Sequence, residues 1–136
     1  MKICMIGTGY VGLVSGACFA DLGNTVYCVD KDHKKIDMLN EGQIPIYEPG
    51  LNEIVNKNYL SNRLKFTTNL SQAVKSSEII FICVGTPTSK KNKSADLQYV
   101  FKAVAEISEY IDRFKSWGNQ ASRRWTNADV CKLLRP

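Results

Sequence analysis

Short apolar runs alternate with segments of helical periodicity along most of this chain. The runs at residues 3–6, 24–29, 64–68 and 78–84 have the length of strands, and the last is the most apolar stretch of all. A strand that is apolar at nearly every position is typical of a parallel sheet covered by helices on both faces. The alternation therefore predicts an α/β fold with a mostly parallel sheet.

Helices are expected between these strands. The predicted segments are a small-residue helix at 14–22, shorter helices at 34–40, 51–56 and 70–75, and an amphipathic helix that carries an apolar stripe from Leu97 to Ile111. Ser71 is a plausible N-cap for the fourth helix. The segment 44–51 contains two prolines and cannot be a regular helix.

The end of the chain departs from this pattern. Residues 116–125 show neither strand alternation nor a helical stripe, although the order of elements calls for another parallel strand there. The net charge of +5 also belongs to this end, because basic and acidic residues balance up to residue 112. Two Trp and two Arg residues in this segment leave a basic-tailed nucleic-acid binder open as an alternative. The first 112 residues give that alternative no support.

Composition narrows the other possibilities. A chain of 136 residues is expected to form one domain, with no run of eighteen apolar residues to cross a membrane and no cleavable signal pattern. Its five cysteines show no CxxC pair or metal-ligand spacing, and its one histidine lies in a polar stretch. We therefore nominate no metal site and expect a reducing cytoplasm as the compartment.

A glycine-rich turn, Gly7-Thr8-Gly9-Tyr10-Val11-Gly12, joins the first strand to the first helix. Gly7 permits a tight turn, Gly9 lets the backbone approach a pyrophosphate, and Gly12 lets the helix pack closely on the sheet. The amides that open the helix then face the phosphate charge. In this context the motif predicts a dinucleotide site, and the alternative is a glycine-rich turn that binds nothing.

Asp30 ends the second strand, eighteen residues beyond Gly12. A carboxylate there accepts hydrogen bonds from the adenosine ribose hydroxyls and repels a 2′-phosphate, which favours NAD over NADP. Lys31, Lys34 and Lys35 are close in sequence, and a nearby cation attracts a phosphate. The alternative role for Asp30 is that of a helix N-cap, which Asp32 could also fill.

The turn Gly85-Thr86-Pro87 follows the strand at 78–84, at the sheet edge where ligands of open α/β folds bind. A polar loop with three lysines, residues 89–94, comes next. For these lysines a solvated surface is favoured over a phosphate contact.

Three blocks of sequence, residues 1–16, 42–51 and 83–87, together with their spacing, resemble the start of the UDP-glucose 6-dehydrogenases, a group of nucleotide-sugar dehydrogenases. The resemblance extends to about residue 115. It implies a Rossmann-type doubly wound domain with helices on both faces of the sheet. Relatives that act on GDP-mannose or UDP-N-acetylhexosamines stay open, and the block Ile44-Pro45-Ile46-Tyr47-Glu48-Pro49-Gly50-Leu51 favours UDP-glucose.

The resemblance also implies an activity and a set of contacts. These enzymes oxidise the primary alcohol of the sugar to a carboxylate in two hydride transfers to NAD, through a covalent cysteine adduct, and work as homo-oligomers. Tyr10 and Val11 would lie against the pyrophosphate, Asp30 and Lys35 at the adenosine ribose, and Thr86 near the cofactor. The alternative for Lys35 is an ordinary solvated helix lysine, and the alternative for Glu48 is a role in shaping its loop alone. Together with Gly7, Gly9 and Gly12, the first five of these residues form the expected NAD site.

Two departures from the family limit what is expected of this chain. The motif Lys-Ser-Thr-Val-Pro-Val-Gly-Thr, which the family has after residue 115, is missing, and a compensated frameshift across residues 116–125 is our hypothesis for the replacement. The family's catalytic cysteine and sugar-binding half lie beyond residue 136, and none of the five cysteines present lies in the family's nucleophile motif, so we nominate no catalytic residue. We therefore expect an incomplete NAD-binding domain at 1–115 and an atypical basic tail at 116–136. Such a chain would be inactive alone and bind UDP-glucose only if the missing half is supplied. The alternative is a non-catalytic, nucleotide-binding remnant of a decayed gene.

Overall fold

The computed structural model describes residues 1–88, 95–111 and 116–119, and only the backbone of the last segment. The predictions for the loop 89–94 and for residues 120–136 fall outside these ranges. The elements are β1 (Lys2–Ile6), α1 (Tyr10–Asp21), β2 (Thr25–Val29), α2 (His33–Asn40), α3 (Leu51–Leu60), β3 (Leu64–Thr67), α4 (Leu70–Ser76), β4 (Ile79–Ile82), α5 (Gln98–Ser108) and β5 (Ser116–Asn119).

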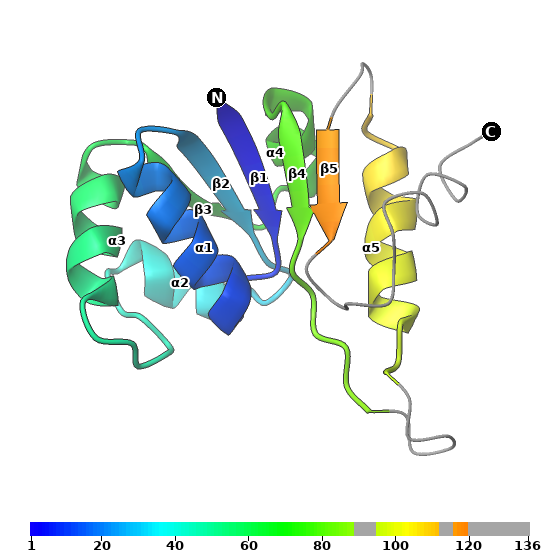
Figure 1. Cartoon of the computed structure of the whole chain (residues 1–136), viewed down its shortest axis with the longest axis horizontal. Helices are drawn as coiled ribbons and strands as arrows, with labels where there is room; N and C mark the ends of the chain where they lie inside the picture. Colours follow the sequence, from blue (N-terminus) through cyan, green and yellow to red (C-terminus); the bar gives the residue numbers. More distant parts are fainter. Residues whose placement is uncertain (89–94, 112–115, 120–136) are drawn as a thin grey trace.

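The strands form one parallel sheet in the order β3-β2-β1-β4-β5 (Figure 1). The chain builds outward from β1 to β2 and β3, and then crosses back to place β4 on the other side of β1. Such a reversal opens a crevice at the carboxyl ends of the two strands, where ligands of doubly wound sheets bind. The prediction of a mostly parallel α/β sheet is confirmed.

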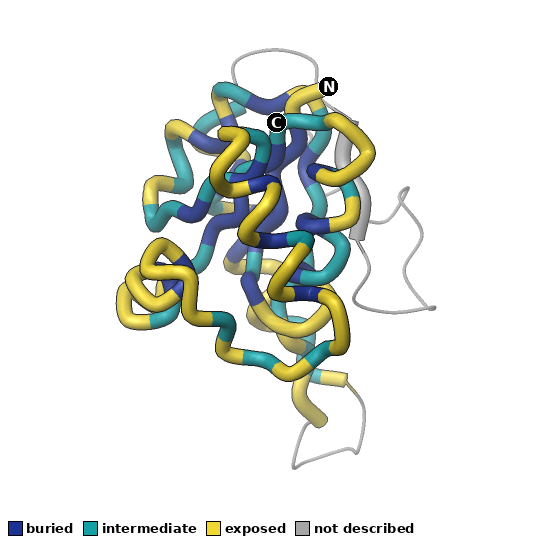
Figure 2. Tube along the Cα trace, turned by 90° about the vertical axis from the view of Figure 1, so that its left-hand side faces the viewer, coloured by how far each residue is buried: buried dark blue, intermediate teal, exposed yellow. Residues whose placement is uncertain are grey.

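Helices cover both faces of this sheet, and β1 shows how the sequence achieves it. Ile3 and Met5 point into one core with α1, α2 and α3, whereas Cys4 and Ile6 point into the other core with α4 and α5. Successive side chains of a strand face opposite sides, so a strand between two helical layers must be apolar throughout. Figure 2 shows the buried residues gathered along the middle of the molecule.

The order of elements calls for another parallel strand after residue 115, and the structure has one at residues 116–119, so the expectation of an irregular tail is wrong for these four residues. This segment pairs in parallel with β4, in a register that sets Ser116 opposite Ile79 and Asn119 opposite Ile82. A strand at the edge of a sheet is held by main-chain hydrogen bonds to its neighbour, which need no side-chain alternation. The sheet therefore continues past the expected boundary at 115.

Some element boundaries also differ from the predictions. Helix α1 begins at Tyr10 rather than at residue 14, and α3 continues to Leu60 rather than ending at 56. The N-cap of α4 is Asn69, whose side chain accepts a hydrogen bond from the amide of Gln72, and not Ser71. No helix in the described part of the chain is both long and apolar enough to cross a membrane.

Candidate functional site

A cleft of about 790 Å³ opens at the carboxyl edge of the sheet. Its walls are the glycine turn, the ends of β1, β2 and β4, the start of α4, and one side of α5. The lining residues are Ile6, Gly7, Gly9, Val29, Asp30, Lys31, Lys35, Thr68, Asn69, Leu70, Ser71, Cys83, Val84, Gly85, Pro87, Tyr99, Lys102, Ala103, Glu106 and Tyr110. The size and the mixture of apolar walls with a few polar groups suit a nucleotide-sized ligand.

Gly7 and Gly9 both line this cleft, but their Cβ positions have different surroundings. Gly7 has a φ of +99°, and a Cβ there would lie 2.7 Å from the carbonyl oxygen of Cys83, so both its conformation and its close contact with the end of β4 require glycine. A Cβ on Gly9 would meet no protein atom within 4 Å. The space beside Gly9 is therefore open for a ligand to approach the backbone.

Gly12 sits under the turn. A Cβ on Gly12 would lie 1.9 Å from the carbonyl oxygen of Gly7 and 3.2 Å from Cβ of Cys83. The role predicted for Gly12 is close packing of the helix on the sheet. In the structure its tightest contact is with the glycine turn, at the carbonyl oxygen of Gly7. Because the N-cap of α1 is Gly9, no side chain of the cap residue occupies the first amides of the helix. These amides and the helix dipole can thus face an anion.

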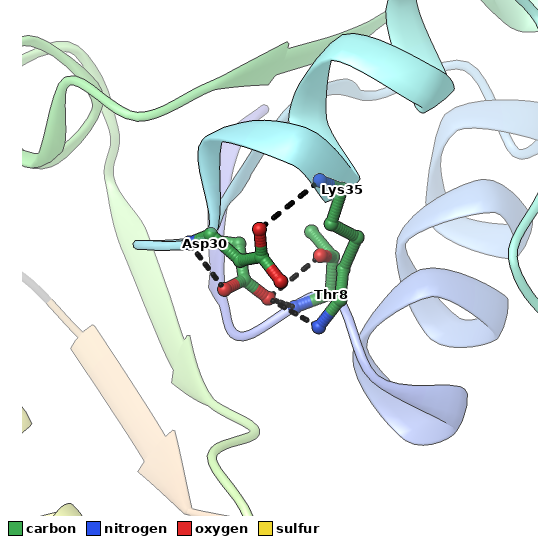
Figure 3. A network of polar contacts seen from close by, with 4 residues as sticks. Thr8, Asp30 and Lys35 are labelled. Atoms are coloured by element: carbon green, nitrogen blue, oxygen red, sulfur yellow. Dashed lines mark hydrogen bonds and ion pairs between the residues drawn. The ribbon is translucent and has the colours of Figure 1, made fainter.

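Asp30 is held by a network of donors (Figure 3). Its Oδ2 accepts hydrogen bonds from the amide of Thr8 at 2.8 Å, from the Thr8 hydroxyl at 2.7 Å and from Nζ of Lys35 at 3.3 Å. Its Oδ1 accepts one from the amide of Asp32 at 3.1 Å. The N-cap of α2 is Asp32, not Asp30, so the capping alternative for Asp30 is wrong.

The electrostatics of Asp30 follow from this network. Burial by itself raises the pKa of a carboxyl, but the hydrogen bonds from Thr8 and Asp32 and the charge of Lys35 outweigh it and lower the pKa of Asp30. The side chain is therefore an anion at neutral pH. An ionised carboxylate only accepts hydrogen bonds, which is the property that sugar hydroxyls need in a partner.

The remaining predicted residues lie around the same edge. Tyr10 and Val11 are the first two residues of α1 and are 53 % and 46 % exposed. Thr86 is half-buried between Gly85 and Pro87, which both line the cleft, but Thr86 is not itself among the lining residues. The structure thus brings Gly7, Gly9, Asp30 and Lys35 into the cleft walls and leaves Tyr10, Val11, Gly12 and Thr86 beside them in the chain.

Tyr10 has a further contact that joins two of the sequence blocks. Its hydroxyl donates a hydrogen bond to the carboxylate of Glu48, and this bond raises the pKa of Tyr10. The loop at 43–50 is thereby tied to the start of α1. Glu48 accordingly has a structural partner in the glycine-turn region.

Two residues of this site were not predicted from the sequence. Thr8 is 1 % exposed and anchors Asp30, and its place between Gly7 and Gly9 was the available signal. Glu106 on α5 forms an ion pair with Lys31, with Oε1 and Nζ 2.5 Å apart, and both residues line the cleft. They are 75 positions apart, so nothing in the sequence pairs them.

Comparison with known proteins identifies relatives of this site. The family model described as "UDP-glucose/GDP-mannose dehydrogenase family, NAD binding domain" matches residues 1–116. A UDP-glucose 6-dehydrogenase of Rhizobium meliloti (strain 1021) is 55 % identical over 114 residues, which are 84 % of this chain and 26 % of the relative. The UDP-glucose 6-dehydrogenase TuaD of Bacillus subtilis (strain 168) is 52 % identical over 121 residues, 89 % of this chain and 26 % of the relative. The chain thus spans about a quarter of the length of these relatives.

Solved structures give the same result. A ternary complex of GDP-mannose dehydrogenase from Pseudomonas aeruginosa matches 98 % of this chain with 37 % identity and a TM-score of 0.87, over 32 % of the larger protein. A UDP-glucose dehydrogenase from Pyrobaculum islandicum matches 97 % with 31 % identity and a TM-score of 0.85, again over 32 % of the larger protein. The cleft and its glycine turn therefore belong to a fold that dehydrogenases of nucleotide sugars share.

Proposed function

We propose how this chain, which belongs to the UDP-glucose/GDP-mannose dehydrogenase family, holds the NAD of the family's NAD-binding domain. The diphosphate lies over Gly9 and the first amides of α1, beside Tyr10 and Val11. The adenosine ribose lies on Asp30, near Lys35. Support comes from the open space at Gly9 and the absence of a capping side chain on that residue.

The observation that carries the proposal is the held carboxylate of Asp30. Within the described residues, its Oδ2 already has three donors, whereas Oδ1 has one. Oδ1 can therefore accept a ribose hydroxyl without breaking a contact. A second hydroxyl would replace Lys35 on Oδ2, because that contact is the longest of the three at 3.3 Å. The side chain of Lys35 is also more exposed than that of Asp30.

Gly7, Gly12 and Thr86 support this mode of binding in our proposal. Gly7 and Gly12 hold the turn in shape through their close backbone contacts. Thr86 follows β4 at the switch point between β1 and β4, on the side of the cleft opposite to Asp30. We assign Thr86 to the part of the cofactor that is remote from the adenosine.

The reaction is the second part of the proposal. NAD supplies a hydride acceptor when it is bound. We propose that the hydride comes from the primary alcohol of UDP-glucose, in an enzyme whose sugar-binding part is present as well. The relatives named UDP-glucose 6-dehydrogenase support this substrate. In that reaction the residues described here bind and orient the cofactor and do not touch the sugar carbon.

Calorimetric titration with NAD tests the binding mode directly. Asp30→Ala should weaken the affinity at least about tenfold, since a hydrogen bond to a charged group contributes about 1.5–3 kcal/mol. Asp37→Ala is the matched control, because it removes the same charge from an exposed position on α2. A wild-type chain that gives no binding heat would reject the cofactor site, and an unchanged affinity in Asp30→Ala would reject the ribose contact.

Activity needs a separate assay, namely NADH formation with UDP-glucose. We expect no turnover by this chain alone, and turnover would overturn both that expectation and the alternative of a non-catalytic remnant.

Light scattering tests the homo-oligomer that the resemblance implies. We also propose a reducing, cytoplasmic location, in line with cysteines that form no disulfide among the described residues.

A further inference from the structure

Among the described residues, three lysines line the cleft near the proposed ribose site, namely Lys31, Lys35 and Lys102. A 2′-phosphate on the adenosine ribose would extend toward the residues beside Asp30. Cations at such a position commonly hold the 2′-phosphate of NADP. On composition alone, this cleft would therefore tolerate NADP despite the carboxylate of Asp30.

Two of these lysines already have anionic partners. Lys35 contacts Oδ2 of Asp30, and Lys31, which directly follows Asp30 in the chain, contacts Oε1 of Glu106. Glu106 is on α5 and Lys31 is at the end of β2, so this ion pair joins two walls of the cleft. Asp30 thus pairs with Lys35, and Glu106 pairs with Lys31.

We propose that Glu106 is a specificity-determining residue that keeps this site selective for NAD over NADP. Glu106 acts through Lys31, because the ion pair withholds this cation from a 2′-phosphate. The inference rests on the proposed function, because it requires the ribose to lie at Asp30. It adds a second carboxylate, far from the glycine motif in sequence, to the determinants of cofactor choice.

The ion pair suits this role because it is exchangeable. Both side chains are solvent-exposed, at 74 % for Lys31 and 40 % for Glu106, and exposed ion pairs hold their partners weakly. Neutralising Glu106 should therefore leave the fold intact and free Lys31 for a new anion. The effect is expected in the affinity for the 2′-phosphate and not in the stability of the protein.

The test uses adenosine 2′,5′-bisphosphate and 5′-AMP as probes, since they differ only in the 2′-phosphate. In calorimetry at low ionic strength, Glu106→Gln should raise the affinity for the bisphosphate relative to 5′-AMP by about fivefold, the size expected for an exposed charge pair. The gain should shrink as added salt screens the charges. The NADP-to-NAD affinity ratio should rise in parallel.

Two further variants make the result specific. Glu109→Gln changes the net charge equally, just beyond the end of the same helix, at an exposed residue that does not line the cleft, and should leave the preference unchanged. Lys31→Ala should cancel the gain when it is combined with Glu106→Gln. A gain that survives in the double variant would assign the phosphate to another cation such as Lys102 and overturn the inference. An unchanged preference in Glu106→Gln, or an equal gain in Glu109→Gln, would overturn it too.

Wild-type titrations separate this inference from the function on which it rests. If the wild-type chain binds NAD and 5′-AMP but Glu106→Gln leaves the preference unchanged, only the role of Glu106 is rejected. If the wild-type chain binds neither probe, the proposed cofactor site itself is rejected.

Discussion

Helix α1 runs between two aspartates that have similar chemistry and different surroundings. Asp30 lies near the start of the helix, at the carboxyl edge of the sheet, and Asp21 is the last residue of the helix, at the opposite edge. Each forms an ion pair with a lysine, and in each the pKa of the carboxyl is lowered. The two networks nevertheless differ in their surroundings, because only Asp30 lines the cleft.

The network at Asp21 joins the ends of two helices and lies away from the cleft. Oδ1 accepts hydrogen bonds from Nζ of Lys57 at 2.7 Å and from Nδ2 of Asn58 at 3.0 Å, and these two bonds are the main causes that lower the pKa of Asp21. Asn58 is fully buried; it also donates to the carbonyl oxygen of Ile54 and accepts from Nε of Arg63. This arrangement ties α1 to α3.

The network at Asp30 faces a cleft instead. Asp30 and Lys35 both line it, next to the open space at Gly9, whereas Asp21 is not among the lining residues of the described chain. A lowered carboxyl pKa is therefore no sign of a binding site by itself. What distinguishes Asp30 is its position on a cleft wall beside Gly9, whose missing Cβ leaves room for a ligand.

The largest expected effect at the cleft end comes from Gly12→Ala. Its Cβ would lie 1.9 Å from a backbone oxygen, which no side-chain motion can relieve. We expect a loss of about 3 kcal/mol or more in the free energy of unfolding and loss of NAD binding. Denaturant unfolding and calorimetry measure the two quantities.

Gly9→Ala is the matched control for that change. Its Cβ would meet no protein atom, so the stability should fall by less than about 1 kcal/mol while the affinity for NAD falls more than tenfold. Equal destabilisation by the two substitutions would contradict the division of roles between these glycines.

In the network around Asp21, Asn58→Ala should have the next largest effect. It removes a buried amide that joins Asp21, Ile54 and Arg63, and should lower the free energy of unfolding by about 2 kcal/mol. The NAD affinity of the folded protein should not change. Asn56→Ala, at an exposed position on the same helix, serves as the control in denaturant unfolding. A large change in NAD affinity would show that the two ends are coupled.

Thr8→Val tests how Asp30 is held. The amide donor stays, but the hydroxyl that donates to Oδ2 is lost, so the affinity for NAD should fall about fivefold, the equivalent of about 1 kcal/mol. The pKa of Asp30 should also rise, because the ionised form loses a donor, and the acid limb of NAD binding should move to higher pH. Thr8→Ser should restore both properties in calorimetric titrations at several pH values. A purely structural role for Thr8 would leave that limb unmoved.

The smallest effect is the pH dependence of stability. In both networks the folded-state pKa of the carboxyl lies below its ordinary value of 3.8. Each carboxyl therefore contributes stability that is fully present well above pH 3.8 and is lost as the pH falls through the folded-state pKa. Unfolding free energies from neutral pH down to this acid range should be less pH-dependent in Asp21→Asn and in Asp30→Asn than in the wild type. Only Asp30→Asn should also change the pH dependence of NAD binding.

Much of this protein could be predicted locally, and the reason is physical. The apolar run at 78–84 requires cover on both faces wherever it lies, and Gly7, Gly9 and Gly12 impose their backbone requirements on their own turn. The position of Asp30 at the binding edge follows from its place at the end of the second strand. Local residue patterns were thus enough to predict the parallel sheet, the glycine turn and the carboxylate beside it.

Tertiary structure alone decided the partners of the polar groups and the last strand. Thr8 meets Asp30 across 22 positions, Tyr10 meets Glu48 across 38, and Lys31 meets Glu106 across 75. Ion pairs and hydrogen bonds of this kind have no sequence period, because they depend on where helices are set on the sheet. The strand at 116–119 is likewise defined by the free edge of β4 and not by its own side-chain pattern. Local apolar and glycine patterns therefore determined the scaffold, and long-range packing determined which charges meet in the cleft.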